Sequence, residues 1–205
     1  MAEDTTRSLN VEYENSTLGA ALSSHLQDSK LVESRKIFMF EGVNANVAKR
    51  VNADLLILDS MGNEPIDFFI NSPGGEVNSG FAIFDTIRFI KSPVRIINAG
   101  LCASIATIIN IATKKELRFS LPNSRFLIHQ PLIMGQIQGQ ASDLEITAKQ
   151  ILQTRAKINK LLALECGQSL EKVSEDTIRD YWMSAEEAKD YGLITHIIDS
   201  HDQLK

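Results

Sequence analysis

One serine in the middle of the chain lies where a nucleophile could be activated. Residues 94–97 are a short β-branched run that predicts a strand, and residues 108–112 are too continuously apolar for a solvent-facing segment. Between them, Gly100 can make a tight turn that a residue with a Cβ would resist. The pattern predicts a strand, a sharp turn and a buried helix, with Ser104 at or near the helix start. Free N–H groups and the helix dipole there would stabilise an oxyanion beside its hydroxyl.

The same position has a simpler explanation, because a serine at a helix start is usually only a cap. The segment does not match the G-x-S-x-G nucleophile elbow, so that hydrolase family gains no support. Cys102 and Cys166 both fall in apolar patterns and are expected to be buried thiols in a reducing compartment.

Two other segments carry residues that could serve a reaction. The Pro-Gly-Gly run ending at Gly75 closely follows a predicted strand over 66–70, so its backbone N–H groups could approach a ligand, although a plain turn is the favoured explanation of such a run by itself. His129 stands at the end of a predicted strand over 125–128, before a proline turn. A histidine in such a place is more often structural than catalytic.

Composition limits the class of protein. The chain has 205 residues, 43% of them hydrophobic and 23% charged, which suits one globular domain. Its net charge of -5 argues against a nucleic-acid partner. The N-terminus lacks a signal-peptide profile, and the longest apolar run, residues 101–112, is too short to span a membrane. We therefore expect a cytoplasmic protein, and the sequence contains no metal-ligand cluster.

The order of the elements predicts an α/β fold with largely parallel strands. Helices are expected over residues 46–60 and 79–90, with strands after each. A capping box at Ser142 predicts a long helix to about residue 165, and a second at Ser184 predicts a short helix closed by Gly192. The apolar residues of the long helix fall on one stripe: Leu144, Ile151, Leu152, Ile158, Leu161 and Leu162.

The remaining segments have weaker patterns. Residues 178–183 are expected to form an irregular connector, and residues 193–198 a final strand. Residues 133–140 hold glycines and glutamines without charge, and they could extend as an exposed ribbon. The edge of such a ribbon invites a peptide or another subunit.

Five motifs occur together in one known family. They are Ile-Asn-Ser-Pro-Gly-Gly at 70–75, Gly-x-x-Ala-Ser at 100–104, Leu-Pro-Asn-Ser-Arg-x-x-Ile-His-Gln-Pro at 121–131, Gly-Gln-Ala-x-Asp at 139–143 and Arg-Asp-x-x-Met-Ser-Ala-x-Glu-Ala at 179–188. In order and spacing they resemble the caseinolytic serine peptidase family ClpP, from roughly Leu31 to Ile198. The resemblance implies a ClpP/crotonase-like fold of repeated ββα units. It would have a flexible arm over residues 1–20, one domain over 21–198 with a protruding handle at about 132–165, and a polar tail over 199–205.

The resemblance assigns roles to individual residues. Ser104 would be the nucleophile, His129 the general base and Asp180 the acid that orients the imidazole. The backbone N–H groups of Gly75 and Ile105 would form the oxyanion hole. The other implied residues are those that bind substrate backbone, Gly74, Gly135, Gln136 and Gln138, and those that dock an unfoldase, Phe69 and Phe89.

The family also implies an assembly and partners. Its members form two stacked heptameric rings that enclose serine endopeptidase sites, and here the rings could be homomeric or shared with a second ClpP paralogue. An AAA+ unfoldase such as ClpX, ClpA or ClpC would feed in unfolded proteins for cleavage to short peptides. The chain has no nucleotide motif of its own, so no cofactor is expected and ATP would be used by the unfoldase.

Several positions depart from the family pattern. Ile105 and Ala106 stand where Met-Gly is common, and Ile105 would narrow the first specificity pocket. Ile178 stands where an acidic residue is common, and Asp67 where a tyrosine is common. These departures suggest a divergent paralogue. Two alternatives stay open: a non-catalytic scaffold subunit of a mixed ring, and a crotonase-type acyl-CoA enzyme that uses backbone oxyanion donors without a triad.

Overall fold

The computed structural model describes residues 29–132 and 140–204. The chain divides into two units, residues 1–36 and residues 37–205. Of the first, the structure describes residues 29–36, which begin with a helical stretch over 29–33. The predicted N-terminal arm over residues 1–20 lies outside the described residues. Among the described residues, no helix is both long and apolar enough to cross a membrane.

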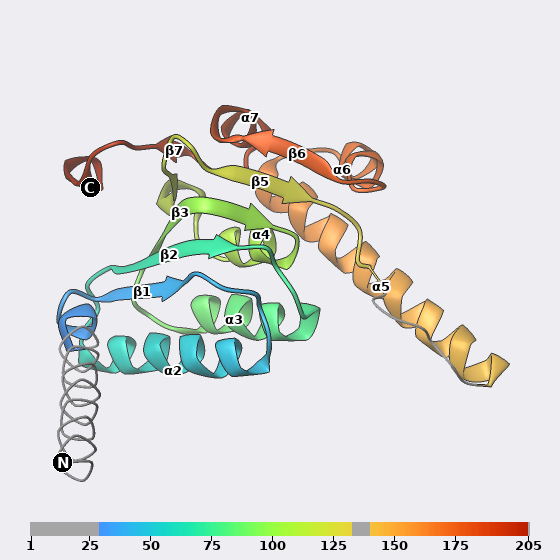
Figure 1. Ribbon diagram of the computed structural model, residues 1–205, viewed down its shortest axis with the longest axis horizontal. Coiled ribbons are helices and arrows are strands. Elements are labelled where there is room, and N and C mark those ends of the chain that lie inside the picture. Colours follow the sequence, from blue (N-terminus) through green and yellow to red (C-terminus); the bar gives the residue numbers. More distant parts are fainter. Residues whose placement is uncertain (1–28, 133–139, 205) are drawn as a thin grey trace, which may run out of the picture. The chain divides into compact units, whose positions relative to one another are not determined.

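A seven-stranded sheet organises the chain from Lys36 onward (Figure 1). Its strands are β1 (Lys36–Met39), β2 (Ile66–Ser72), β3 (Val94–Ala103), β4 (Arg118–Ser120), β5 (Arg125–Ile128), β6 (Tyr181–Ser184) and β7 (His196–Ile197). The order is β1-β2-β3-β4-β7, and β5 also pairs with β3 and carries β6 on its other side. β3 pairs in parallel with β2, β4 and β5, and only the β5–β6 pair among those with described register is antiparallel. The predicted α/β class with largely parallel strands is confirmed.

Helices cover the sheet and supply most of the core. They are α2 (Ala45–Met61), α3 (Val77–Phe89), α4 (Ile105–Asn110), α5 (Ala141–Cys166), α6 (Leu170–Asp176) and α7 (Ala185–Tyr191). α2 and α3 lie side by side under β1 and β2 (Figure 1). Ile66, Phe68 and Ile70 of β2 are completely buried with them in the main core. Helices on the faces of a parallel sheet leave little of its central strands exposed.

The predicted turn at Gly100 is wrong, because β3 continues through it to Ala103. Gly100 has φ +121°, and a Cβ there would lie 2.8 Å from the Asn71 Oδ1. That same oxygen accepts a hydrogen bond from the Leu101 N–H at 2.9 Å. The glycine is therefore needed for a close approach between β2 and β3, and the chain turns later, at Ser104.

Three further expectations about the C-terminal half need correction. α5 begins at Ala141 with no side-chain cap, so the capping box predicted at Ser142 is wrong. Residues 181–184, placed partly in an irregular connector, form β6 because they pair with β5. The final strand is limited to His196–Ile197. The capping box at Ser184 and the left-handed closing position of Gly192, with φ +93°, are confirmed.

Candidate active site

Ser104 stands at the junction between β3 and α4 in a strained conformation. Its φ of +57° is unusual for a residue with a side chain and costs about 1–3 kcal/mol. The Ser104 N–H donates to the Leu127 carbonyl at 2.8 Å, and the Thr107 hydroxyl donates to the Ser104 carbonyl at 2.6 Å. Its side chain makes no capping hydrogen bond to α4. The hydroxyl is therefore not used as the simple cap that the sequence allowed.

Strand pairing brings His129 to this hydroxyl. Ala103 of β3 lies beside Leu127 of β5 in a parallel pair, so both strands end at the same edge of the sheet. His129 follows β5 there, and its Nε2 lies 2.8 Å from the Ser104 Oγ. The His129 side chain is only 14% exposed. A base within hydrogen-bond reach of a hydroxyl is the arrangement required to activate a serine.

Asp180 completes the arrangement from the other side of β5. Ile128 pairs with Tyr181 in the antiparallel β5–β6 register, so the flanking residues, His129 and Asp180, lie opposite each other. The His129 Nδ1 is 3.0 Å from the Asp180 Oδ1. The Asp180 side chain is 61% exposed. Hydroxyl, imidazole and carboxylate thus form one hydrogen-bonded series with the geometry of a serine triad.

The glycine loop after β2 lies directly against the serine. An added Cβ on Gly74 would lie 2.6 Å from the Ala103 carbonyl oxygen and 2.7 Å from the Ser104 Cβ. At Gly75 it would lie 2.1 Å from the Val43 oxygen. The loop is fixed by hydrogen bonds in which the Val43 N–H donates to the Gly74 carbonyl and the Glu76 N–H donates to the Val43 carbonyl, each at 2.8 Å. Close backbone approach therefore requires glycine at both positions.

The first turn of α4 supplies a second backbone donor. Ile105 is the first residue of the helix, where an N–H group has no acceptor within the helix. Its side chain is buried and packs over α3, since a Cβ added to Gly80 would lie 2.2 Å from the Ile105 Cγ1. The Ile105 N–H and the neighbouring glycine loop thus offer backbone N–H groups, which are chemically suited to stabilise an oxyanion.

A small, mainly apolar pocket opens beside the serine and the histidine. Besides Ser104 and His129 it is lined by Val77, Ile105, Thr107, Ile108, Ile128, Pro131, Ile158 and Leu162. The last two come from α5, so the long helix forms one wall.

Burial raises the pKa of the nearby Cys102 thiol far above its ordinary value, and it raises that of Cys166 to about 12. Both cysteines are therefore neutral, buried thiols, as expected from the sequence.

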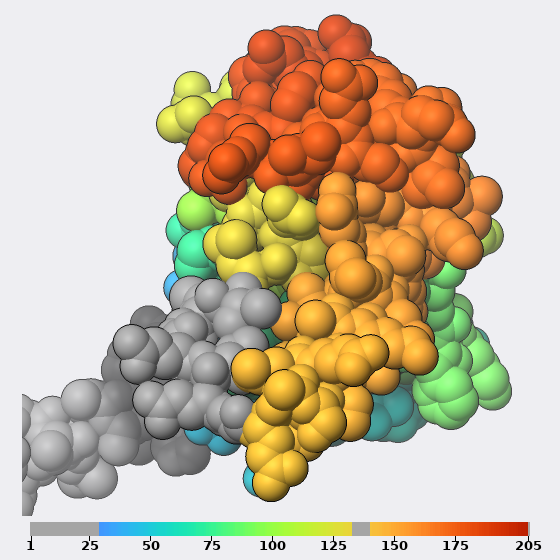
Figure 2. All heavy atoms as spheres, turned by 90° about the vertical axis from the view of Figure 1, so that its right-hand side faces the viewer, coloured from blue at the N-terminus to red at the C-terminus, as the bar shows by residue number. Residues whose placement is uncertain are grey.

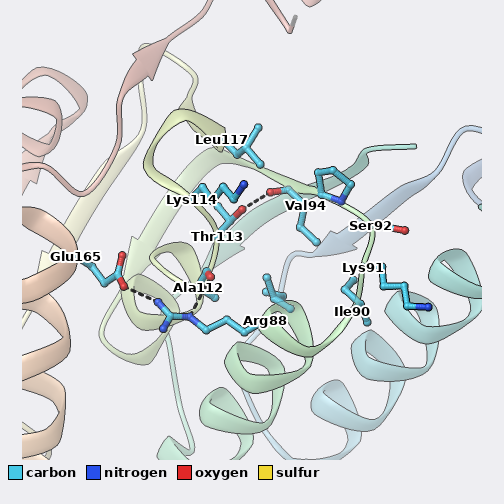
Figure 3. A pocket seen from close by; sticks show the side chains of 12 residues that line it. Arg88, Ile90, Lys91, Ser92, Val94, Ala112, Thr113, Lys114, Leu117 and Glu165 are labelled. Carbon is cyan, nitrogen blue, oxygen red and sulfur yellow. Dashed lines mark hydrogen bonds and ion pairs between the residues drawn. The ribbon is translucent and has the colours of Figure 1, made fainter. Parts of the chain in front are cut away.

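A larger hollow lies elsewhere, between α3, the start of β3 and the end of α5 (Figure 3). Its central arginine is already engaged: Arg88 contacts the Glu165 carboxylate at 2.6 Å and donates to the Ala112 carbonyl at 3.2 Å. Ser104, His129 and Asp180 do not line this hollow. It therefore offers a structural ion pair rather than a reacting group.

The remaining expected positions are distributed as follows. Gly135, Gln136 and Gln138 lie outside the described residues. Phe69 stacks on Phe38 with ring centroids 5.0 Å apart. Phe89 is 81% exposed at the end of α3.

Phe69 packs against a separate small cluster of Ile97, Phe119 and Ile198, which also contacts Leu121 and Leu204. The departure at Asp67 has a structural explanation. Its Oδ1 accepts from the Arg95 Nε at 2.7 Å, and the Arg95 Nη1 donates to the Leu204 carbonyl at 3.0 Å. Asp67 therefore helps to hold the C-terminal segment beside this cluster.

Among the described residues, no group of three His, Cys, Asp or Glu side chains could hold a metal ion. The strained φ at Ser104 had no sequence signal, since serine does not favour that conformation.

The family model described as Clp protease matches residues 21–201. The ATP-dependent Clp protease proteolytic subunit 2 of Gluconobacter oxydans is 44% identical over 196 residues, which span 95% of this chain and 86% of that protein. Proteolytic subunit 3 of Rhizobium johnstonii is 46% identical over 177 residues, spanning 86% of this chain and 90% of that protein. A substituted ClpP1 from Listeria monocytogenes has a solved structure that matches with a TM-score of 0.80 and 45% identity, covering 86% of this chain and 98% of that one. The predicted fold and resemblance are confirmed.

Proposed function

Because the chain belongs to the Clp protease family and is homologous to proteolytic subunits of ATP-dependent Clp proteases, we propose that it is an active serine endopeptidase with Ser104 as nucleophile. The observation that carries this proposal is the hydrogen-bonded series from Ser104 through His129 to Asp180. A subunit that served only as a scaffold would not need to hold an imidazole 2.8 Å from a strained serine. A crotonase-type enzyme would not need this series either.

The geometry supports acyl transfer in two halves. The Ser104 Oγ attacks the substrate carbonyl carbon while the His129 Nε2 takes the hydroxyl proton. The resulting oxyanion accepts hydrogen bonds from the N–H groups of Gly75 and Ile105. As the C–N bond breaks, His129 returns the proton to the leaving amine. Water then attacks the acyl-enzyme by the same route and regenerates Ser104. Throughout, Asp180 orients the imidazole and stabilises its charged form.

The walls of the site favour small apolar side chains at the cleaved residue. Ile105, Ile158 and Leu162 line the pocket beside Ser104, and branched side chains on a helix wall leave little depth. Substrate backbone would pair with Gly74 and with the segment carrying Gly135, Gln136 and Gln138. Recognition through main-chain hydrogen bonds accounts for cleavage of many unfolded sequences.

The active form in this proposal is a barrel of two stacked heptameric rings, homomeric or shared with a second ClpP paralogue, in the cytoplasm. An AAA+ unfoldase such as ClpX, ClpA or ClpC would deliver unfolded polypeptide and use the ATP, so this chain needs no cofactor. Phe69 and Phe89 are the proposed contacts for that partner. The exposed ring of Phe89 and the apolar cluster beside Phe69 support this assignment.

A fluorophosphonate probe tests the proposal, since it labels only an activated serine. We expect labelling at Ser104 and hydrolysis of short fluorogenic peptides, both abolished in Ser104→Ala. The exposed helix residue Ser60, whose hydroxyl donates to the Ile57 carbonyl, provides the control, and Ser60→Ala should keep both activities. Absence of labelling in the folded, assembled protein, with or without a second paralogue, would favour the scaffold alternative.

A further inference from the structure

The acid of the triad needs support from its backbone. Asp180 is 61% exposed and lies in the short connection between α6 and β6, residues 177–180. An exposed carboxylate on a short connection has many available positions. Its alignment with His129 therefore depends on what fixes the connection itself.

Gln130, the residue after His129, makes two hydrogen bonds to that connection. Its backbone N–H donates to the Thr177 carbonyl at 2.7 Å. Its side-chain Nε2 donates to the Ile178 carbonyl at 2.9 Å. One residue thus binds two successive carbonyls of the segment that carries Asp180, directly beside the imidazole that Asp180 must meet.

Thr177, whose carbonyl accepts from the Gln130 N–H, is itself held by hydrogen bonds. Thr177 is completely buried, and both its N–H and its hydroxyl donate to the Val173 carbonyl, at 3.0 and 2.8 Å. The same hydroxyl also lies 3.3 Å from the Oδ1 of Asn159, a buried residue of α5. Gln130 therefore ties the end of β5 to a fixed position at the end of α6.

On the basis of the proposed function, we propose that Gln130 is a positioning residue that holds Asp180 in register with His129 through its side-chain hydrogen bond to Ile178. The backbone bond to Thr177 persists in any non-proline substitution. The side chain supplies the second attachment and prevents the connection from rotating about the first. Methionine has a similar length and shape but cannot donate, so Gln130→Met removes this attachment alone.

The chain contains a matched control in Gln168. Its Nε2 donates to the Tyr191 carbonyl, also at 2.9 Å, in a half-buried position that does not line the pocket beside Ser104. Gln168→Met removes the same kind of bond without touching the Asp180 connection. Rates in all variants are expressed per active site, so that loss of folded protein does not count as loss of catalysis.

In Gln130→Met we expect kcat to fall about tenfold with little change in KM, because a misplaced acid affects the reacting geometry rather than substrate binding. The acid limb of the kcat/KM profile should move to lower pH, because the imidazolium loses support from the carboxylate. In an Asp180→Asn background, Gln130→Met should cost less than twofold, since it acts through Asp180. Gln168→Met should leave kcat, KM and the pH profile unchanged.

Equal effects of Gln130→Met in both backgrounds, or an unchanged profile, would overturn the inference. Crystal structures of Gln130→Met and Gln168→Met test the role of Gln130 without any measurement of activity. The distance between His129 Nδ1 and Asp180 Oδ1 should exceed about 3.5 Å in Gln130→Met and stay at its present 3.0 Å in Gln168→Met. An inactive native protein would refute the proposed function alone. An unchanged distance in Gln130→Met would refute the role of Gln130 alone.

Discussion

The two halves of α5, an outer N-terminal half and an inner C-terminal half, differ in how far their apolar side chains are buried. The C-terminal half buries Ile158, Asn159, Leu162 and Cys166 against the body. The N-terminal half leaves apolar side chains in solvent: Leu144 is 40% exposed, Ile146 60% and Leu152 62%. In the space-filling view, this helix runs down one face beneath the C-terminal elements (Figure 2). Only the C-terminal half is therefore part of the core of the single chain.

Charged groups as well as apolar ones hold the inner, C-terminal half of α5 against the rest of the chain. Arg118 of β4 is completely buried, and it donates to the Thr113 carbonyl at 2.8 Å and to the Glu165 carbonyl at 3.0 Å. The Glu165 carboxylate contacts Arg118 with one oxygen and Arg88 with the other, each at 2.6 Å. The last turn of α5 is thus joined to both the sheet and α3. Within the part of the chain that the structure describes, the outer half has exposed apolar residues but no such charged anchors. The proposed ring assembly would cover these exposed apolar residues with another chain.

The ion pairs of Glu165 with Arg118 and Arg88 form a charged anchor. Breaking this anchor should give the largest loss of stability. Arg118→Met leaves several buried carbonyls without a donor and removes the buried partner of Glu165. We expect the free energy of unfolding to fall by about 3–5 kcal/mol, measured by urea denaturation at fixed protein concentration. Arg50, an exposed residue paired with Glu41, is the control, and Arg50→Met should cost less than about 1 kcal/mol. Equal losses in the two variants would contradict the contrast.

Two leucines of α5 test the contrast within one helix. Leu162 is 1% exposed and Leu152 is 62% exposed. Leu162→Ala should lower the free energy of unfolding by about 2–4 kcal/mol through the cavity it leaves, whereas Leu152→Ala should change it by less than about 0.5 kcal/mol. Leu152→Ala should instead weaken ring assembly, seen as smaller species in sedimentation velocity. A loss of subunit stability in Leu152→Ala with normal assembly would show that the outer half belongs to the single-chain core.

Two glycines test how tightly α7 closes against the inner half. Both Gly167 and Gly192 have left-handed backbones, with φ of +73° and +93°. A Cβ on Gly192 would lie 2.2 Å from the Cys166 carbonyl oxygen, whereas on Gly167 the nearest atom would be the flexible Lys115 Nζ at 3.6 Å. We expect Gly167→Ala to cost about 1 kcal/mol in thermal unfolding and Gly192→Ala about twice that. Equal costs would mean that α7 can shift away from α5 freely.

The contrast within α5 also shows what the sequence could and could not predict. The apolar period correctly predicted one long helix ending before Gly167. It also predicted one apolar stripe, but that stripe is buried only in part, since Leu144 and Leu152 are exposed. Periodicity predicts that a helix has an apolar face, but it does not say which chain covers each part of that face.

The same limit applies to the site. Ser104 and His129 could be placed by local patterns, because both lie at strand ends whose residues are recognisable. Asp180 lies opposite His129 through pairing between residues 51 positions apart, so only the family resemblance identified it. The Gln130 side-chain bond spans 48 positions and had no local signal. The turn predicted at Gly100 was wrong because a glycine needed for close approach to Asn71 looks the same in sequence as one needed for a turn.

The smallest expected effect is the pH dependence of stability that comes from the charge of Glu165. It separates the electrostatic part of the charged anchor from its shape. Partial burial of Glu165 tends to raise its pKa, but hydrogen bonds and charge from Arg88 and Arg118 outweigh this, so the pKa lies below the ordinary value. A carboxyl with a lowered pKa in the folded state stabilises the fold above its unfolded pKa, and that stability is lost as the pH falls through the folded one. Glu165→Gln mimics the protonated carboxyl at every pH. The difference in unfolding free energy between the native protein and Glu165→Gln should therefore be largest above about pH 5 and shrink toward pH 3.

The control is Glu145→Gln, on the exposed half of α5, whose unfolding free energy should match that of the native protein at every pH. A pH-independent difference for Glu165→Gln would mean that the anchor acts through shape and hydrogen bonding rather than through charge.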